Sequence, residues 1–143
     1  MSPSNYKAYQ TSSRQSLSAT EATALLLDTA YDHMQKATQA IVEGNIERRF
    51  QESEKATLIL GNLESALVRV NETQSKTADA LKDYYDSMVS LITRMNMKND
   101  KASAEAISES LKTMADEFRK VSVLHEKSLH ETSEPTETLK VGA

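Results

Sequence analysis

Residues 18–44 read SATEATALLLDTAYDHMQKATQAIVEG, and this stretch decides the fold class. Ser18 and Glu21 have the spacing of a capping box, in which each side chain accepts a hydrogen bond from the other residue's amide at a helix start. Apolar residues then recur every three or four positions, as on one face of an α-helix. Gly44 follows them, as glycine often does just beyond a helix C-terminus. The stretch therefore predicts a helix that ends at about Glu43. Its expected core positions are Leu27, Ala30, Tyr31, Met34, Ala37 and Ile41.

Three further segments have the same helical periodicity. We expect helices at about residues 46–70, 76–97 and 101–125, separated by a polar link at residues 72–75 and by a break at residues 99–100 that supplies a new N-cap. Such short links make antiparallel neighbours the simplest packing. The expected core positions are Phe50, Ile59, Leu63, Ala66 and Val70, then Ala78, Leu81, Tyr85, Met88, Ile92 and Met95, and finally Ile107, Leu111, Met114, Phe118 and Val121.

These segments predict an all-α protein, an antiparallel up-down four-helix bundle. The 143 residues suffice for one domain with one core. Only three Gly and two Pro occur in the chain, which favours helices over turn-rich sheets. We expect the bundle at residues 18–125, after a flexible N-terminal arm at residues 1–17. Residues 126–143 are rich in Ser, Thr and Glu and contain Pro135, so we expect a disordered acidic tail.

Composition excludes several classes of protein. The chain has no Cys, which excludes disulfides, thiolate metal sites and cysteine nucleophiles. Its first residues lack the apolar region of a secretory signal, and no run approaches the roughly 18 apolar residues of a membrane-spanning helix. The net charge of -4 repels phosphate backbones and argues against a nucleic acid as the main partner. We therefore expect a cytoplasmic protein without membrane insertion.

Two apolar runs are wider than a bundle core needs. Helical residues advance by about 100° each, so Leu25, Leu26 and Leu27 span about 200° of their helix. Residues 58–60, which read Leu-Ile-Leu, are a second run of three apolar residues and span an equally wide part of the next helix. A neighbouring helix or the arm can cover any one of these leucines. Two such runs on one small bundle nevertheless favour a groove for a partner helix, or a dimer face.

The N-terminal arm carries aromatic residues on a segment too polar to fold alone. Two of the five tyrosines, Tyr6 and Tyr9, lie there together with Lys7 and Arg14 and no acidic residue. The tyrosines are therefore candidate anchors. Three states remain open for the arm: it covers an empty groove, it clamps a bound partner, or it is disordered throughout.

The titratable residues offer little chemistry. The sequence lacks the Glu-x-x-His pairs of di-iron bundles, and its scattered glycines cannot form a phosphate-binding loop. We expect His125 and His130, in or beside the acidic tail, to be solvated. His33 and Lys36 match the His-x-x-Lys part of histidine phosphotransfer domains, but Ala37 replaces the usual glycine. We expect no catalytic residue, metal site or cofactor, and phosphotransfer by His33 is an alternative.

Five stretches match one known family in order and spacing. They are residues 5–10 (Asn-Tyr-Lys-Ala-Tyr-Gln), 26–30 (Leu-Leu-Asp-Thr-Ala), 55–63 (Lys-Ala-x-x-Ile-Leu-x-x-Leu), 81–88 (Leu-x-x-x-Tyr-Asp-x-Met) and 96–100 (Asn-Met-Lys-Asn-Asp). With this pattern over about residues 5–118, the chain resembles the flagellar export chaperone family FliS. Ala19, Leu27, Thr29 and Phe118 stand where that family usually has Pro, Tyr, Gly and often Trp. Leu27 lacks the tyrosine hydroxyl but keeps the apolar bulk.

The resemblance implies a chaperone without enzymatic activity. Its client would be the C-terminal segment of flagellin, kept from premature polymerisation and competent for flagellar type III export. The flagellar export gate or another export regulator is a further candidate partner, and the chain would be a monomer or a homodimer. A homodimeric helical adaptor without a client is the alternative.

The candidate partner-binding residues come from the apolar runs and from the family motifs. The leucines at residues 25–27 and Ala30, with Leu58, form the candidate groove, and Asp28, Asp86 and Asn96 are candidates for bonds to the client backbone. The full set is Tyr6, Tyr9, Gln10, Leu25, Leu26, Leu27, Asp28, Ala30, Leu58, Tyr85, Asp86, Met88, Ile92 and Asn96. For Tyr85, Met88 and Ile92, core packing competes with partner contact, because they lie on the inward stripe of their helix.

Deletion of residues 1–10 tests the role of the arm. If the arm is a cover, the truncated chain binds flagellin's C-terminal peptide more tightly, because nothing competes for the groove. If the arm is a clamp, the truncated chain binds more weakly. An unchanged affinity in a titration of both chains contradicts both roles.

Overall fold

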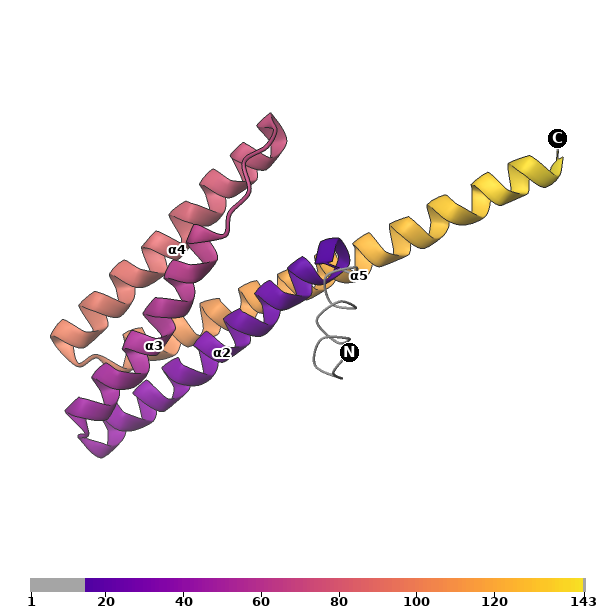
Figure 1. Ribbon diagram of the computed structural model, residues 1–143. Coiled ribbons are helices and arrows are strands. Elements are labelled where there is room, and N and C mark those ends of the chain that lie inside the picture. Colours follow the sequence, from indigo (N-terminus) through magenta and orange to yellow (C-terminus); the bar gives the residue numbers. More distant parts are fainter. Residues whose placement is uncertain (1–14, 143) are drawn as a thin grey trace, which may run out of the picture.

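The computed structural model describes residues 15–142, with side chains for residues 19–124, 127 and 128. These residues form four helices, which are α2 (Gln15–Glu43), α3 (Ile46–Ser65), α4 (Glu72–Lys98) and α5 (Lys101–Gly142) (Figure 1). The prediction of an all-α four-helix bundle is confirmed. Tyr6, Tyr9 and Gln10 of the arm lie outside the described residues.

The helices form two antiparallel pairs that diverge from a common end. Helix α2 packs against α5 and α3, and α4 packs against α3 and α5. Figure 1 shows α2 beside α5 and α3 beside α4, with the two pairs separating toward the start of α2. We name the end with the turns at residues 44–45 and 99–100 the closed end. The opposite end, with the α3–α4 link at residues 66–71, is the open end.

Tight turns connect the pairs at the closed end. Gly44 has a φ of 72°, a region that glycine adopts without strain, which confirms its place after the helix. Asn45 then caps α3 by accepting a hydrogen bond from the amide of Arg48 at 3.0 Å. At the second turn Asn99 has a φ of 51°, and the Asp100 carboxylate accepts from the amide of Ala102 at 3.1 Å. Asp100 is thus the predicted N-cap.

The core draws on all four helices. Its buried residues are Leu27, Ala30, Met34, Ala37, Ala56, Leu60, Leu63, Tyr85, Met88, Ile92, Met95, Ala104, Ile107, Leu111 and Ala115. Four predicted core positions are wrong, because Phe50, Ala66, Val70 and Val121 are exposed. For Phe50 the reason is a polar stripe on α3 that turns this ring outward, and for Val121 it is the divergence at the open end.

Helix α3 is shorter than predicted. It ends at Ser65, and the predicted polar link at residues 72–75 is instead the first turn of α4. Helix α4 starts this early because Asn71 caps it: the Asn71 side chain accepts a hydrogen bond from the amide of Gln74 at 2.8 Å. Ala66 and Val70 therefore lie in the link rather than on a helix face.

Helix α5 is longer than predicted. The backbone remains helical to Gly142, where the sequence predicted a helix end near His125 and a disordered tail. Residues 126–134 contain no Gly or Pro and include Glu, Lys and Leu, which favour helix. Beyond the open end α5 extends away from the other three helices (Figure 1).

A buried polar network joins α3 to the C-terminus of α4. Arg49, only 5% exposed, donates from Nε to Oδ1 of Asn96 at 3.2 Å and from Nη1 to Oδ1 of Asn99, the C-cap of α4. Asn96 in turn donates to Oγ of Ser53 at 2.9 Å. Among the described residues Arg49 has no carboxylate partner, so amide oxygens and the negative end of α4 balance its charge.

Substitution of Arg49 tests this network against its exposed neighbour. Arg49→Ala removes the buried guanidinium that donates to Asn96 and Asn99, so we expect the free energy of unfolding to fall by about 1–3 kcal/mol. Arg48→Ala removes only an exposed ion pair with Glu43 and should cost less than about 0.5 kcal/mol. Urea unfolding followed by circular dichroism measures both. Equal effects would contradict a structural role for Arg49.

Candidate partner-binding surface

The three consecutive leucines of α2 have three different environments. Leu27 is fully buried in the core, Leu26 is 41% exposed and Leu25 is 64% exposed. As expected for an apolar run wider than the core needs, Leu25 and Leu26 thus lie at least partly outside the core. Leu27, however, cannot contact a partner while the core is intact.

Leu26 lies on the side of α2 that faces α3. Leu26, Ala30, His33 and Ala37 follow each other at spacings of three and four residues, so they form one stripe. His33 on this stripe contacts α3, since its Nδ1 lies 2.7 Å from Oε2 of Glu52. Toward the open end α3 has moved away from α2 (Figure 1), and Leu26 is left partly uncovered.

Helix α5 shows the same effect on the side that faces α4. Ser110 contacts α4 through a hydrogen bond of 3.0 Å with the hydroxyl of Tyr84. Met114, Phe118 and Val121 continue from Ser110 toward the open end at helical spacing. Met114 and Phe118 are partly buried against the core, whereas Val121 is 51% exposed because α4 no longer covers it.

Leu26, Met114, Phe118 and Val121 define what we name the open-end surface. By helical spacing, Leu26 lies on the side of α2 that faces α3, and the other three lie on the side of α5 that faces α4. They continue the core stripes past the point where the two pairs separate. The arrangement suits an apolar helix that packs where α3 and α4 have diverged.

The α3/α4 pair adds an apolar depression at the same end of the molecule. It lies between the α3–α4 link and the first turns of α4, and it is lined mainly by Leu67, Val68, Ala78 and Leu81. Leu67 and Leu81 also pack against the core. Apolar side chains are therefore accessible on both helix pairs at the open end.

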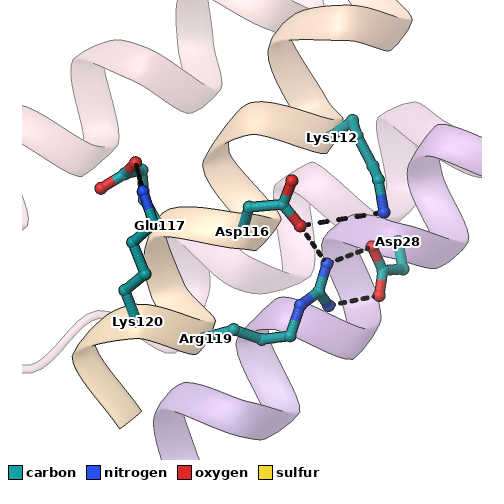
Figure 2. A network of polar contacts seen from close by, with 6 residues as sticks. All are labelled: Asp28, Lys112, Asp116, Glu117, Arg119 and Lys120. Carbon is teal, nitrogen blue, oxygen red and sulfur yellow. Dashed lines mark hydrogen bonds and ion pairs between the residues drawn. The ribbon is translucent and has the colours of Figure 1, made fainter. Parts of the chain in front are cut away.

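Leu25 lies elsewhere, in a small depression on the seam between α2 and α5. Glu21, Ala24 and Arg119 line this depression with it. Arg119 also joins the two helices, because its guanidinium donates two hydrogen bonds to Asp28, at 2.6 Å and 3.2 Å (Figure 2). Asp28, a candidate for client contact, is thus engaged in an ion pair within the chain.

The remaining candidates from the sequence are dispersed. Ala30, Tyr85, Met88 and Ile92 are buried in the core. Burial raises the pKa of Tyr85 to about 12, so its hydroxyl stays protonated at neutral pH. Leu58 is 60% exposed, but it follows the buried Ala56 by two residues and lies on the outward side of α3. The structure does not bring Leu58 together with the leucines of α2.

Two polar candidates have partners within the chain. Asn96 belongs to the buried network with Arg49 and Ser53. Asp86 accepts a hydrogen bond from Nζ of Lys82 at 2.7 Å, which lowers the pKa of Asp86. Asn96 therefore stabilises the closed end, whereas Asp86 lies at the surface of α4.

Sequence reasoning did not place Phe118 and Val121 among the candidate partner-binding residues. The periodicity identified both as apolar positions facing a neighbour, and it assigned them to the core. The available signal was length: α5 was predicted to run to residue 125, past the part that α4 can cover when the helices cross at an angle.

No helix among residues 15–142 is both long enough and apolar enough to cross a membrane.

The His33–Glu52 pair gives His33 a structural role between α2 and α3. Both side chains are mostly buried, with 18% and 12% of their surface exposed. Burial acts to raise the pKa of Glu52. The hydrogen bond with His33 and the charge of Lys55 outweigh burial and hold this pKa below its ordinary value. A carboxylate this close to the imidazole repels an incoming phosphoryl group, which weighs against the phosphotransfer alternative.

The lowered pKa of Glu52 makes a prediction about stability and pH. The ionised carboxylate stabilises the folded chain above the ordinary glutamate pKa of 4.5, and this stability is lost as pH falls through the lower folded value. The parent should therefore exceed Glu52→Gln in unfolding free energy at neutral pH, and the difference should shrink below about pH 4.5. Urea titrations across this range measure it. The exposed neighbour variant Glu54→Gln is the control, and a pH-independent difference for Glu52→Gln would refute the pair's contribution.

No curated protein matches the chain closely enough to count as a relative. The family model described as "Flagellar protein FliS" matches residues 2–125, which include α2, α3, α4 and α5 as far as the open end. Because this match covers most of the sequence, the chain belongs to the FliS family of flagellar chaperones.

Proposed function

We propose that this chain is a cytoplasmic chaperone for the C-terminal segment of flagellin. It holds the segment in a form that cannot polymerise and that remains competent for flagellar export. The observation that carries the proposal is family membership over residues 2–125. The open-end surface supplies a place for the client, because it presents apolar side chains on helices that the closed end holds in position.

An amphipathic client helix suits this surface. The helix would place apolar residues at spacings of three and four against Leu26, Phe118 and Val121, in the direction that α3 and α4 leave open. A client that is disordered when free loses conformational entropy on binding, so a preformed surface limits the total cost. Binding and release of this kind need no nucleotide. A competing partner at the export gate, or another export regulator, is the proposed cause of release.

The second candidate function is a homodimeric adaptor. The observation that favours it is the exposure of Val123 and Leu124 on α5, at 62% and 64%, near the open end. A second copy could cover these side chains. Gel filtration with and without flagellin distinguishes the functions, because a dimer indifferent to flagellin favours the adaptor, whereas a new complex of higher mass favours the chaperone.

Substitution of Leu26 tests the client surface. A carboxylate at this position must be desolvated when an apolar helix packs on it, so we expect Leu26→Asp to weaken binding of flagellin's C-terminal peptide by at least about tenfold. Leu58→Asp is the matched control, because it introduces the same charge at an exposed leucine on the outward side of α3. Isothermal titration calorimetry measures both. If Leu26→Asp folds and binds like the parent, the open-end surface is not the client site.

A further inference from the structure

We propose that Arg119 is a positioning residue, which fixes the spacing of α2 and α5 at the open end and so sets client affinity without touching the client. The inference rests on the proposed function, since it concerns the surface assigned to flagellin. Arg119 itself lies on the α2/α5 seam, beside the Leu25 depression, and not among the side chains of the open-end surface.

The α2/α5 pair has little core of its own at this end. On the N-terminal side of Leu27, the buried side chain of α2 among the described residues is that of Ala24. On the C-terminal side of Ala115, the buried side chain of α5 as far as residue 124 is that of Ser122, whose hydroxyl has no hydrogen-bond partner among the described residues. Side chains this small bury little apolar area. Phe118, which lies between Ala115 and Ser122 on α5, is only partly buried against the core. The packing that fixes the two helices nearer the closed end is therefore weaker here.

Arg119 supplies the missing link between the two helices. Its Nη1 and Nη2 donate to the two carboxylate oxygens of Asp28, which lies on α2, in a bidentate pair. Nη2 also donates to Asp116 at 2.6 Å, and Asp116 lies 3.8 Å from Nζ of Lys112 (Figure 2). A bidentate pair restricts orientation as well as distance, because the guanidinium is planar. The ion pair thus fixes both the distance between α2 and α5 and the rotation of each helix about its own axis.

The same helical turns carry the ion pair and the open-end surface. Phe118 directly precedes Arg119 and Val121 follows it by two residues, while Leu26 precedes Asp28 by two. Residues this close on a helix move as one unit. If the pair between Arg119 and Asp28 is lost, α2 and α5 can separate or rotate, and Leu26 then no longer lies at a fixed distance from Phe118 and Val121.

Substitution of Arg119 with a matched neighbour tests the inference. We expect Arg119→Ala to weaken binding of flagellin's C-terminal peptide by about fivefold, a modest effect because the ion pair is partly exposed. Amide hydrogen exchange in the free protein should accelerate at residues 19–30 and 116–124 and stay unchanged at the closed end. The control is Lys120→Ala, since Lys120 forms an ion pair with Glu117 of its own helix, at 3.1 Å, and none across the seam among the side chains that the structure describes. It should change neither measurement.

Two further variants separate positioning from general destabilisation. Arg119→Lys keeps the charge but cannot form the bidentate pair, so we expect a smaller local increase in exchange than for Arg119→Ala, together with a smaller loss of affinity. The double variant Asp28→Arg with Arg119→Asp swaps the two charges and so restores opposite charges across the seam. It should recover part of the affinity that Arg119→Ala loses. No recovery, or exchange that accelerates equally at the closed end, overturns the positioning role.

The failure of the inference is distinguishable from the failure of the proposed function. If the parent chain does not bind the flagellin peptide, the proposed function fails. If the parent binds and folded Arg119→Ala binds equally well, the function stands and the inference is refuted. Faster exchange at the open end with unchanged affinity also refutes it, because the spacing of the helices then does not matter to the client.

Discussion

The fold depends on the fixation of two helix pairs to each other at one end only. Two-residue turns connect the pairs at the closed end, and the His33–Glu52 contact joins α2 of one pair to α3 of the other. Within the α3/α4 pair, the Arg49 network ties α3 to the C-terminus of α4. From the closed end the two pairs run at an angle to each other and separate toward the open end (Figure 1). Helices that pack at an angle share a core only near their crossing, so apolar stripes that continue past it have no partner. The open-end surface is a direct consequence.

The distribution of large and small buried residues follows the same geometry. Leu27, Leu60, Tyr85 and Leu111 are fully or almost fully buried where all four helices meet, and they supply most of the apolar area. Toward the open end the buried positions of α2 and α5 among residues 19–124 are Ala24 and Ser122, and the ion pair between Arg119 and Asp28 joins the two helices. Ion pairs at partly exposed sites contribute little free energy each, but they restrict geometry. Hydrophobic packing thus stabilises the bundle, and the Arg119 pair adjusts the shape of its open end.

Periodicity predicted the four helices and most of the core, because each helix has one apolar stripe and short connections. It could not predict the crossing angle, which depends on side chains from different helices meeting in space. Val121 illustrates this limit, since its position on the stripe is correct and its exposure follows only from the divergence of α4. Phe50 illustrates another, because the neighbouring Arg49 occupies the inward position through hydrogen bonds that no periodic pattern reveals. Hydrophobicity alone would bury Phe50 and expose Arg49, which is the reverse of their positions in the structure.

The three leucines at residues 25–27 connect the core with the proposed client site. On one helix turn, consecutive residues must point in different directions, so a run of three cannot enter one core. Leu27 stabilises the bundle, Leu26 continues a core stripe into the open end, and Leu25 lines the seam beside Arg119. A client helix on Leu26 would therefore extend the existing core rather than occupy a separate pocket. This explains why such a surface lacks the deep cavity of a small-molecule site, and why its affinity would depend on how rigidly α2 and α5 are held.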